Sequence, residues 1–218
     1  MNMSSKVRSW IGWGGLLFVV IVVVSIAVAG ASTPDSNASL AKIVSYYQQH
    51  RSGLLAGAYL LELGVLVGLV FFWYLREMLI EAGADRLLVN VGFAGVILFA
   101  VSGALSGGLH LTLWDSVHHA SPVTLQTLNS LSDDLATILA GVGQALFLLA
   151  TGLAVVRSGA MARWLGWSAV VLGVIALALP FVGPLWAGVW VVVASIAILV
   201  GARSEEPARG AIGTAGAG

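Results

Sequence analysis

The 218-residue sequence is 59% hydrophobic and only 9% charged, with a mean hydropathy of +0.98. An ordinary soluble domain is about one quarter charged, so this composition argues against a water-soluble protein. The chain carries no net charge and its ten Lys and Arg residues are scattered, which argues against nucleic acid as a partner. It contains no Cys, which excludes disulfides and thiolate chemistry, and we expect no cofactor.

Long apolar runs follow one another along the chain, and each is close to the about 20 residues that a transmembrane helix needs. The six predicted spans cover residues 10–30, 54–75, 87–113, 135–156, 164–182 and 184–200. The first run exceeds the usual length of a signal peptide core, so we expect an uncleaved span. Pro180, Gly183 and Pro184 separate the last two runs, and five spans with one broken helix is the alternative.

These runs predict an all-α, polytopic helical bundle with a single transmembrane domain, residues 1–204. The Gly- and Ala-rich residues 205–218 lack apolar periodicity and are predicted to be a disordered tail.

Basic residues predict the orientation of the bundle. On one side of this topology lie Lys6, Arg8, Arg76, Arg86, Arg157, Arg163, Arg203 and Arg209, and on the other only Lys42 and Arg51. Because cytoplasmic loops carry the excess of Lys and Arg, both termini are predicted to be inside. Membrane lipids are therefore the expected immediate partners of the bundle.

Two outer segments are predicted to contain helix. In the first, Asp35 or Ser36 could cap a short amphipathic helix before span two, whose apolar face could rest on the membrane surface. In the second, Ser121 and Pro122 form a helix start, and an apolar stripe continues into span four. Span four is therefore expected to extend outside the membrane.

Glu62 is an acidic residue deep inside a predicted span, where a charge costs a few kcal/mol. Counted inward at the helical rise, Glu62 is roughly 13 Å deep, and Ser106 and Gln144 reach about the same depth. Ser102, Ser106 and His110 recur every four residues on one face of span three.

These residues suggest an outward-facing polar pocket with Glu62 at its floor and His110 on its wall. Asp133 and Asp134 would lie at its mouth. The alternative is that Glu62 is protonated and bonded to Gln144 or a serine, as a structural link between helices.

A metal site is not predicted. The weak candidate ligands are His110, His118, His119 and Asp115, but adjacent histidines point in different directions and no paired His motif spans two helices. Gly64 with Gly68 and Gly103 with Gly107 are small-xxx-small pairs, which predict tight contact between spans two and three. A homodimer through either pair is the alternative.

Two stretches carry a resemblance: TPDSNASLAKIVSYYQQHRSGLLAGAYLL before and into span two, and RSGAMARWLGWSAVVLGVIAL after span four. They resemble small six-span membrane proteins of actinobacteria, a family with a domain of unknown function. The resemblance covers most of the chain and implies a cytoplasmic-membrane location, and it supplies no catalytic or ligand residues.

The sequence therefore favours a membrane binding or accessory protein with an outward-facing polar pocket, rather than an enzyme. The alternatives are a proton-linked or cation-linked transporter and a membrane enzyme acting on a lipid or isoprenoid. A small polar molecule, a lipidic molecule or another membrane protein are the partners left open.

Overall fold

The structure, a computed structural model, describes residues 5–29, 34–35, 37–179 and 183–215. Those residues contain helices and no strand: α1 (Ser5–Ala29), α2 (Leu40–Gln49), α3 (Arg51–Glu81), α4 (Arg86–Ser116), α5 (Pro122–Ser158), α6 (Arg163–Ala178) and α7 (Gly183–Ala215). The predicted all-α class is confirmed.

Short side chains at the helix starts explain where several helices begin. The side chains of Ser39, Asp85 and Ser121 accept hydrogen bonds from backbone N–H groups in the first turns of α2, α4 and α5. Such caps satisfy donors that a helix start leaves free. The cap of α2 is thus Ser39 and not Asp35, and Ser36 lies outside the described residues.

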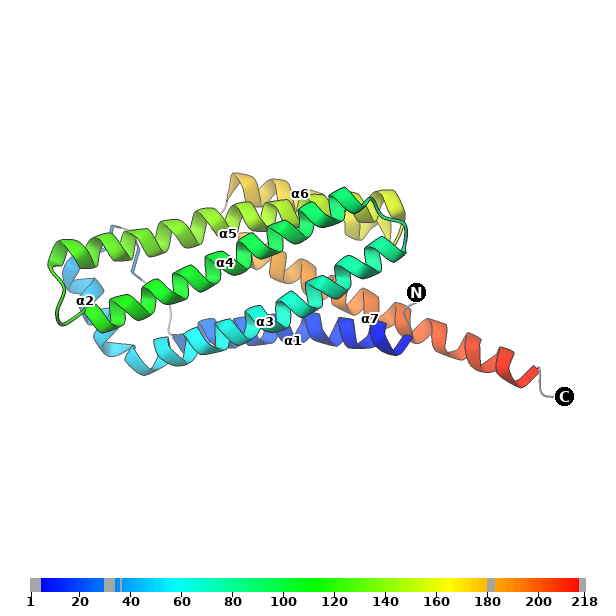
Figure 1. Ribbon diagram of the computed structural model, residues 1–218, viewed down its shortest axis with the longest axis horizontal. Helices are drawn as coiled ribbons and strands as arrows, with labels where there is room; N and C mark the ends of the chain where they lie inside the picture. Colours follow the sequence, from blue (N-terminus) through cyan, green and yellow to red (C-terminus); the bar gives the residue numbers. More distant parts are fainter. Residues whose placement is uncertain (1–4, 30–33, 36, 180–182, 216–218) are drawn as a thin grey trace.

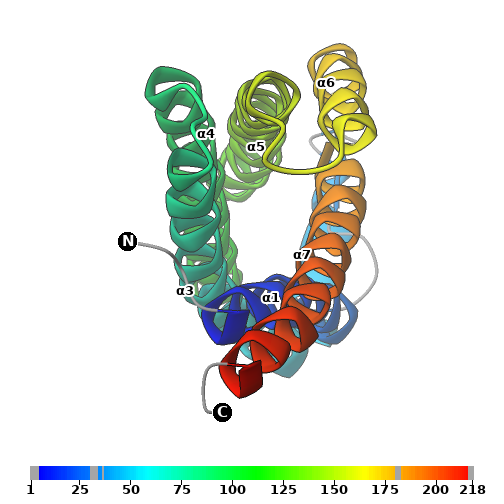
Figure 2. The ribbon, with the colours of Figure 1, turned by 90° about the vertical axis from the view of Figure 1, so that its right-hand side faces the viewer.

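The six long helices form a ring, shown end-on in Figure 2. In ring order α3, α4, α5, α6, α7 and α1 each contact the next, and α1 closes the ring against α3. The helices α6 and α7 are separate and run in opposite directions (Figure 1), so the last two apolar runs are not one broken helix. The residues 180–182 between them are outside the described ranges.

Glycines set a close backbone contact between α4 and α5. A Cβ atom on Gly95 would lie 2.5 Å from the Gly143 carbonyl oxygen, and one on Gly143 would lie 2.7 Å from the Gly95 carbonyl oxygen. These backbones approach as closely as they do because neither residue has a side chain. The register of the α4–α5 hairpin is fixed at this point.

The glycine pairs that the sequence singles out do not make this contact. A Cβ on Gly64 or Gly68 would meet side chains of α1. The Cβ on Gly68 would lie 2.7 Å from the Phe18 ring. Gly103 and Gly107 do face α3, but their nearest atoms there lie 3.9 and 3.8 Å away. The prediction of tight packing between α3 and α4 through these four glycines is therefore wrong, because Gly64 and Gly68 point to α1.

The exterior and the helix lengths are those of a multi-pass membrane protein. Among the described residues, four segments are long and apolar enough to cross a bilayer: Ser9–Ala29, Ser52–Glu81, Arg86–Ser116 and Pro122–Ser158. The apolar helices Arg163–Ala178 and Leu185–Gly201 are shorter. Each of these six helices exposes large apolar side chains, among them Val23, Leu66, Leu105, Ile138, Val171 and Val189. The count of six spans stays a prediction.

The bundle is longer than a bilayer is thick. The 37 residues of α5 correspond to about 55 Å at the helical rise, against about 30 Å of hydrocarbon. Figure 1 shows the α4–α5 hairpin and α2 extending beyond the point where α6 ends and α7 begins. At the opposite end α7 continues as helix to Ala215, and so includes most of the segment for which composition predicts disorder.

Candidate functional site

A hydrogen-bonded group joins α4 to α5 near the end of the bundle that carries α2. The Ser106 Oγ lies 3.5 Å from His110 Nδ1, and the Ser132 Oγ lies 3.3 Å from His110 Nε2. Ser106 and His110 are one helical turn apart on α4, whereas Ser132 is a buried residue of α5. We call Ser106, His110 and Ser132 the serine–histidine cluster.

The helix α2 packs over this cluster rather than lying on the membrane surface by itself. Its residues Ile43, Tyr46 and Tyr47 are buried, and the Tyr47 ring centroid lies 6.2 Å from that of His110. The Tyr47 hydroxyl has no hydrogen-bond partner among the described residues. Burial raises the pKa of both tyrosines, and repulsion from an ionised Tyr46 would raise that of Tyr47 further, so both stay neutral at ordinary pH.

Asn129 holds the chain that leads into α2. Its side chain is 2% exposed, and its Nδ2 donates to the carbonyl oxygens of Pro34 at 3.2 Å and Asp35 at 2.9 Å. A side-chain amide suits this position because its two N–H groups can serve two carbonyls. Asn129 thereby ties the segment before α2 to α5.

Glu62 does not take part in the serine–histidine cluster. Its side chain is exposed, and one carboxylate oxygen lies 3.8 Å from where a Cβ of Gly107 would be. Within the described parts of the chain it makes no hydrogen bond or ion pair, and none links it to Ser106 or Gln144. The structure therefore does not assemble the predicted pocket with Glu62 at its floor and His110 on its wall.

The other predicted pocket residues are also spread over several places. Ser102 is buried on α4 below the cluster, Asp133 is half-buried beside Ser132, and Asp134 is exposed. Asp115, His118 and His119 are exposed, and the two histidine rings lie 6.4 Å apart. Within the residues that the structure describes, no group of three or more His, Asp or Glu is placed to hold a metal ion.

Gln144 lies in a different environment, at the wall of a cavity of about 370 Å³ inside the ring of helices. The cavity is lined by residues of α1, α3, α4, α5 and α7. Gln144 is the one polar side chain among the described lining residues, and it is 3% exposed. Neither its Nε2 nor its Oε1 has a hydrogen-bond partner in the described part of the chain.

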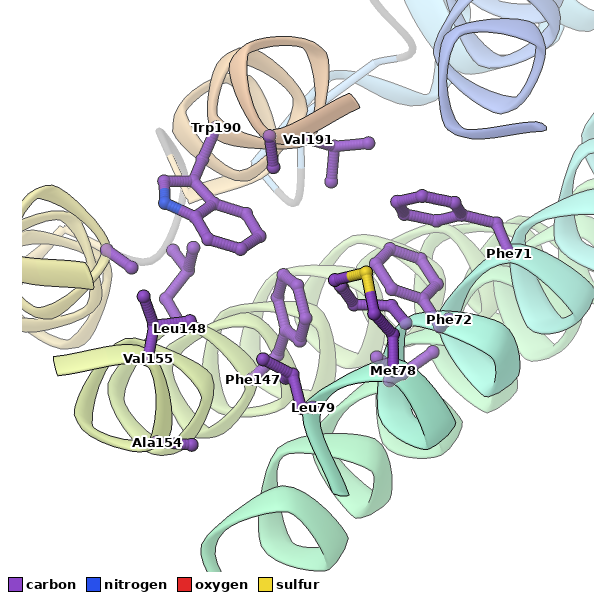
Figure 3. Packing of buried hydrophobic residues seen from close by; sticks show 14 of the residues in the cluster. Phe71, Phe72, Met78, Leu79, Phe147, Leu148, Ala154, Val155, Trp190 and Val191 are labelled. Carbon is purple, nitrogen blue, oxygen red and sulfur yellow. The ribbon is translucent and has the colours of Figure 1, made fainter. Parts of the chain in front are cut away.

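Aromatic rings form one wall of this cavity. Phe72 stands edge-to-face against Phe147 at 4.9 Å between centroids and against Phe18 at 5.6 Å. Figure 3 shows Phe147 of α5 between Phe72 of α3 and Trp190 of α7, whose ring centroid lies 5.5 Å from that of Phe147. Edge-to-face pairs fix the rings in place, so this wall is preformed.

Sequence reasoning missed Tyr47, Asn129 and Ser132. The apolar spacing in residues 40–47 predicts a buried face, but nothing in it says that Tyr47 meets His110. Depth along a span does not identify the neighbour of His110 on α5, because the α4–α5 register brings Ser132 there. Gln144 is predictable as a candidate because it is a polar residue in an apolar span, but the alternative hydrogen bond between Glu62 and Gln144 is not present among the described residues.

Comparisons with protein-family models, with curated proteins and with solved structures gave no match to this chain. Two places in the described structure are candidates for a function: the serine–histidine cluster under α2 and the apolar cavity beside Gln144.

Proposed function

We propose that this chain is a six-span protein of the cytoplasmic membrane, crossing it with α1, α3, α4, α5, α6 and α7. In this proposal both termini are inside and α2 is outside. The distribution of Lys and Arg supports this orientation. The start of α1 and the end of α7 lie at the same end of the bundle, opposite α2 (Figure 1). This supports an even number of crossings, because such a number returns the chain to its starting side.

Cysteine labelling tests this topology cleanly because the native chain has no Cys. Thr127 on α5 and Ala82 after α3 are both exposed, and they lie at opposite ends of the bundle. In intact cells, an impermeant maleimide should label Thr127→Cys and leave Ala82→Cys unlabelled until the cells are lysed. The reverse pattern, or equal labelling of both, would overturn the proposed orientation.

The function that the geometry supports best is binding of a lipid-soluble molecule inside the bundle, in a binding or accessory role. The cavity beside Gln144 carries this proposal. Its volume lies within the about 300–1,000 Å³ range of ligand pockets, and its walls are apolar. A membrane contains lipid-soluble molecules whose apolar surfaces suit such walls. The proposal thus takes up the lipidic ligand left open by the sequence.

The exposed residues on the cavity wall indicate how a ligand enters. Val23 and Ile26 of α1 and Leu185 and Val189 of α7 line the cavity and are also exposed, so the cavity reaches the exterior of the bundle. In a bilayer this exterior is lipid. A molecule dissolved in the membrane can therefore reach the cavity without passing through water.

Gly188 provides the test, because it lines the cavity and a Cβ there would meet nothing within 4 Å. Gly188→Leu should fill the cavity without disturbing the helix. In nanodiscs, with empty discs subtracted, the isoprenoid hydrocarbon farnesene should bind the native protein, and Gly188→Leu should weaken binding by roughly tenfold or more.

The matched control is Gly201→Leu on the same helix, where a Cβ also meets nothing and no cavity wall is near. This variant should bind farnesene like the native protein. Absence of binding to the native protein, or an equal loss in both variants, would contradict the cavity proposal.

A second candidate is an outward-facing polar site at the serine–histidine cluster. The observation that favours it is the buried Tyr47 hydroxyl, which has no hydrogen-bond partner among the described residues and belongs to the ring next to His110. A small polar molecule or a cation could complete its hydrogen bonding. Such a site would exclude Glu62 and would be closed by α2 in this structure.

A further inference from the structure

The Gln144 side chain has an unmet requirement for hydrogen bonds. A buried amide without partners costs about 1–3 kcal/mol, and nearly all such groups in folded proteins are satisfied. Here both polar atoms of the amide are without a partner in the described chain, and the residue lines the cavity. Because both amide atoms are themselves buried, a partner in the adjacent cavity meets them once the Gln144 side chain turns its amide toward that space.

The helix contact next to Gln144 keeps this residue on the side of α5 that lines the cavity. Its neighbour Gly143 packs backbone to backbone against Gly95, so α5 cannot rotate there without opening the α4–α5 contact. Phe147, one turn further along α5, belongs to the aromatic wall of the same cavity. The amide is thus presented from a rigid part of the bundle.

The absence of charge in the cavity wall limits the chemistry of the partner. None of the described lining residues is Asp, Glu, Lys, Arg or His. A phosphate, carboxylate or ammonium group drawn in beside Gln144 would lose its hydration and gain no counter-charge, which is strongly unfavourable in an apolar site. The partner of Gln144 is therefore an uncharged group.

The amide itself narrows the choice among uncharged groups. Oε1 accepts a hydrogen bond and Nε2 donates, so a hydroxyl group can serve both atoms, whereas an ether or ketone oxygen serves only Nε2. We propose that Gln144 binds the hydroxyl group of a neutral long-chain alcohol whose apolar chain occupies the cavity between α1 and α7. This inference rests on the proposed function, that the cavity takes up a lipid-soluble molecule.

Three probes that share the same isoprenoid chain separate uptake by the cavity from hydroxyl binding by Gln144. Farnesene has no polar group, farnesol has a hydroxyl group, and farnesyl phosphate has a charge. Native protein in nanodiscs should bind farnesol several-fold to roughly tenfold more tightly than farnesene, as expected for one or two net hydrogen bonds. Farnesyl phosphate should bind more weakly than farnesol.

Gln144→Leu should abolish the preference for farnesol and keep the affinity for farnesene. The variant is expected to fold, because an apolar group of similar size replaces a buried polar group that has no partner in the described part of the chain. Its midpoint of thermal unfolding should equal or exceed the native value. Gln126→Leu makes the same chemical change at an exposed position of α5 and should keep the preference.

The other possible results of these binding measurements contradict either the role of Gln144 alone or both proposals. Equal binding of farnesol and farnesene to the native protein would mean that the cavity recognises only an apolar chain, such as the acyl chain of a phospholipid. This result would overturn the role of Gln144 and leave the proposed function intact. A preference for farnesol that survives in Gln144→Leu would also overturn that role. If none of the three probes binds, the proposed function fails and this inference fails with it.

Discussion

Gly95→Leu is expected to lower the midpoint of thermal unfolding in detergent by roughly 10 °C, corresponding to a loss of about 3 kcal/mol. The physical reason is the absence of free space. A Cβ on Gly95 would lie 2.5 Å from the Gly143 carbonyl oxygen and 2.6 Å from the Phe147 backbone nitrogen. Because both atoms belong to the backbone of α5, no side-chain rotation can relieve the overlap, and the two helices must separate.

Gly108→Leu is the matched control on the same helix. A Cβ there meets no atom within 4 Å, and leucine has a higher helix propensity than glycine by roughly 1 kcal/mol. This variant should unfold at the native temperature or slightly above it. An unfolding midpoint of Gly95→Leu within about 2 °C of the control would show that α4 and α5 are not held as closely as in the structure.

Much of the fold follows from local features that a single sequence displays. The starts of α4 and α5 coincide with Asp85 and with Ser121 followed by Pro122, residues whose side chains satisfy free N–H groups. The apolar runs determine that the helices are long, because each run must remain in one hydrophobic environment. A left-handed Gly159, with φ of +67°, ends α5 where the apolar run ends.

The candidate site could not be predicted as well. The position of a side chain depends on its depth along the helix and on its direction around the helix axis, and the predicted topology supplies only the depth. Glu62, Ser106 and Gln144 share a depth in the predicted topology, but each residue turns about 100° from the one before it. Which face points inward depends on how neighbouring helices rotate against each other. Here the glycine contact between α4 and α5 sets the rotation of α5 and places Gln144 at the cavity. On α3, Gly64 and Gly68 face α1, and Glu62 stays on the exterior.

The close-packed glycines were visible in the sequence, but their partners were not. A chain with 27 glycines offers many pairs at a spacing of four, so spacing alone does not identify the pair in contact. Gly95 and Gly143 are far apart in sequence and belong to no such motif with each other. Only the antiparallel register of the hairpin brings them together, and this register depends on the turn between α4 and α5.

Asn129→Leu is expected to expose His110 to reagents in water. The native amide donates to two carbonyl oxygens before α2, and the loss of these buried bonds costs about 1–3 kcal/mol. Since α2 packs over the serine–histidine cluster, the population with α2 detached should rise by roughly ten- to a hundredfold. The measurement is the rate at which diethylpyrocarbonate modifies His110, followed by mass spectrometry of the peptide.

His118 and His119 are exposed and serve as internal references, because their rates should not change. Gln126→Leu alters an exposed residue of α5 three positions earlier and should leave His110 protected. If His110 reacts as slowly in Asn129→Leu as in the native protein, Asn129 does not hold α2 in place. If His110 already reacts rapidly in the native protein, the cluster is open to the outside, and the polar site would need no movement of α2 to receive a ligand.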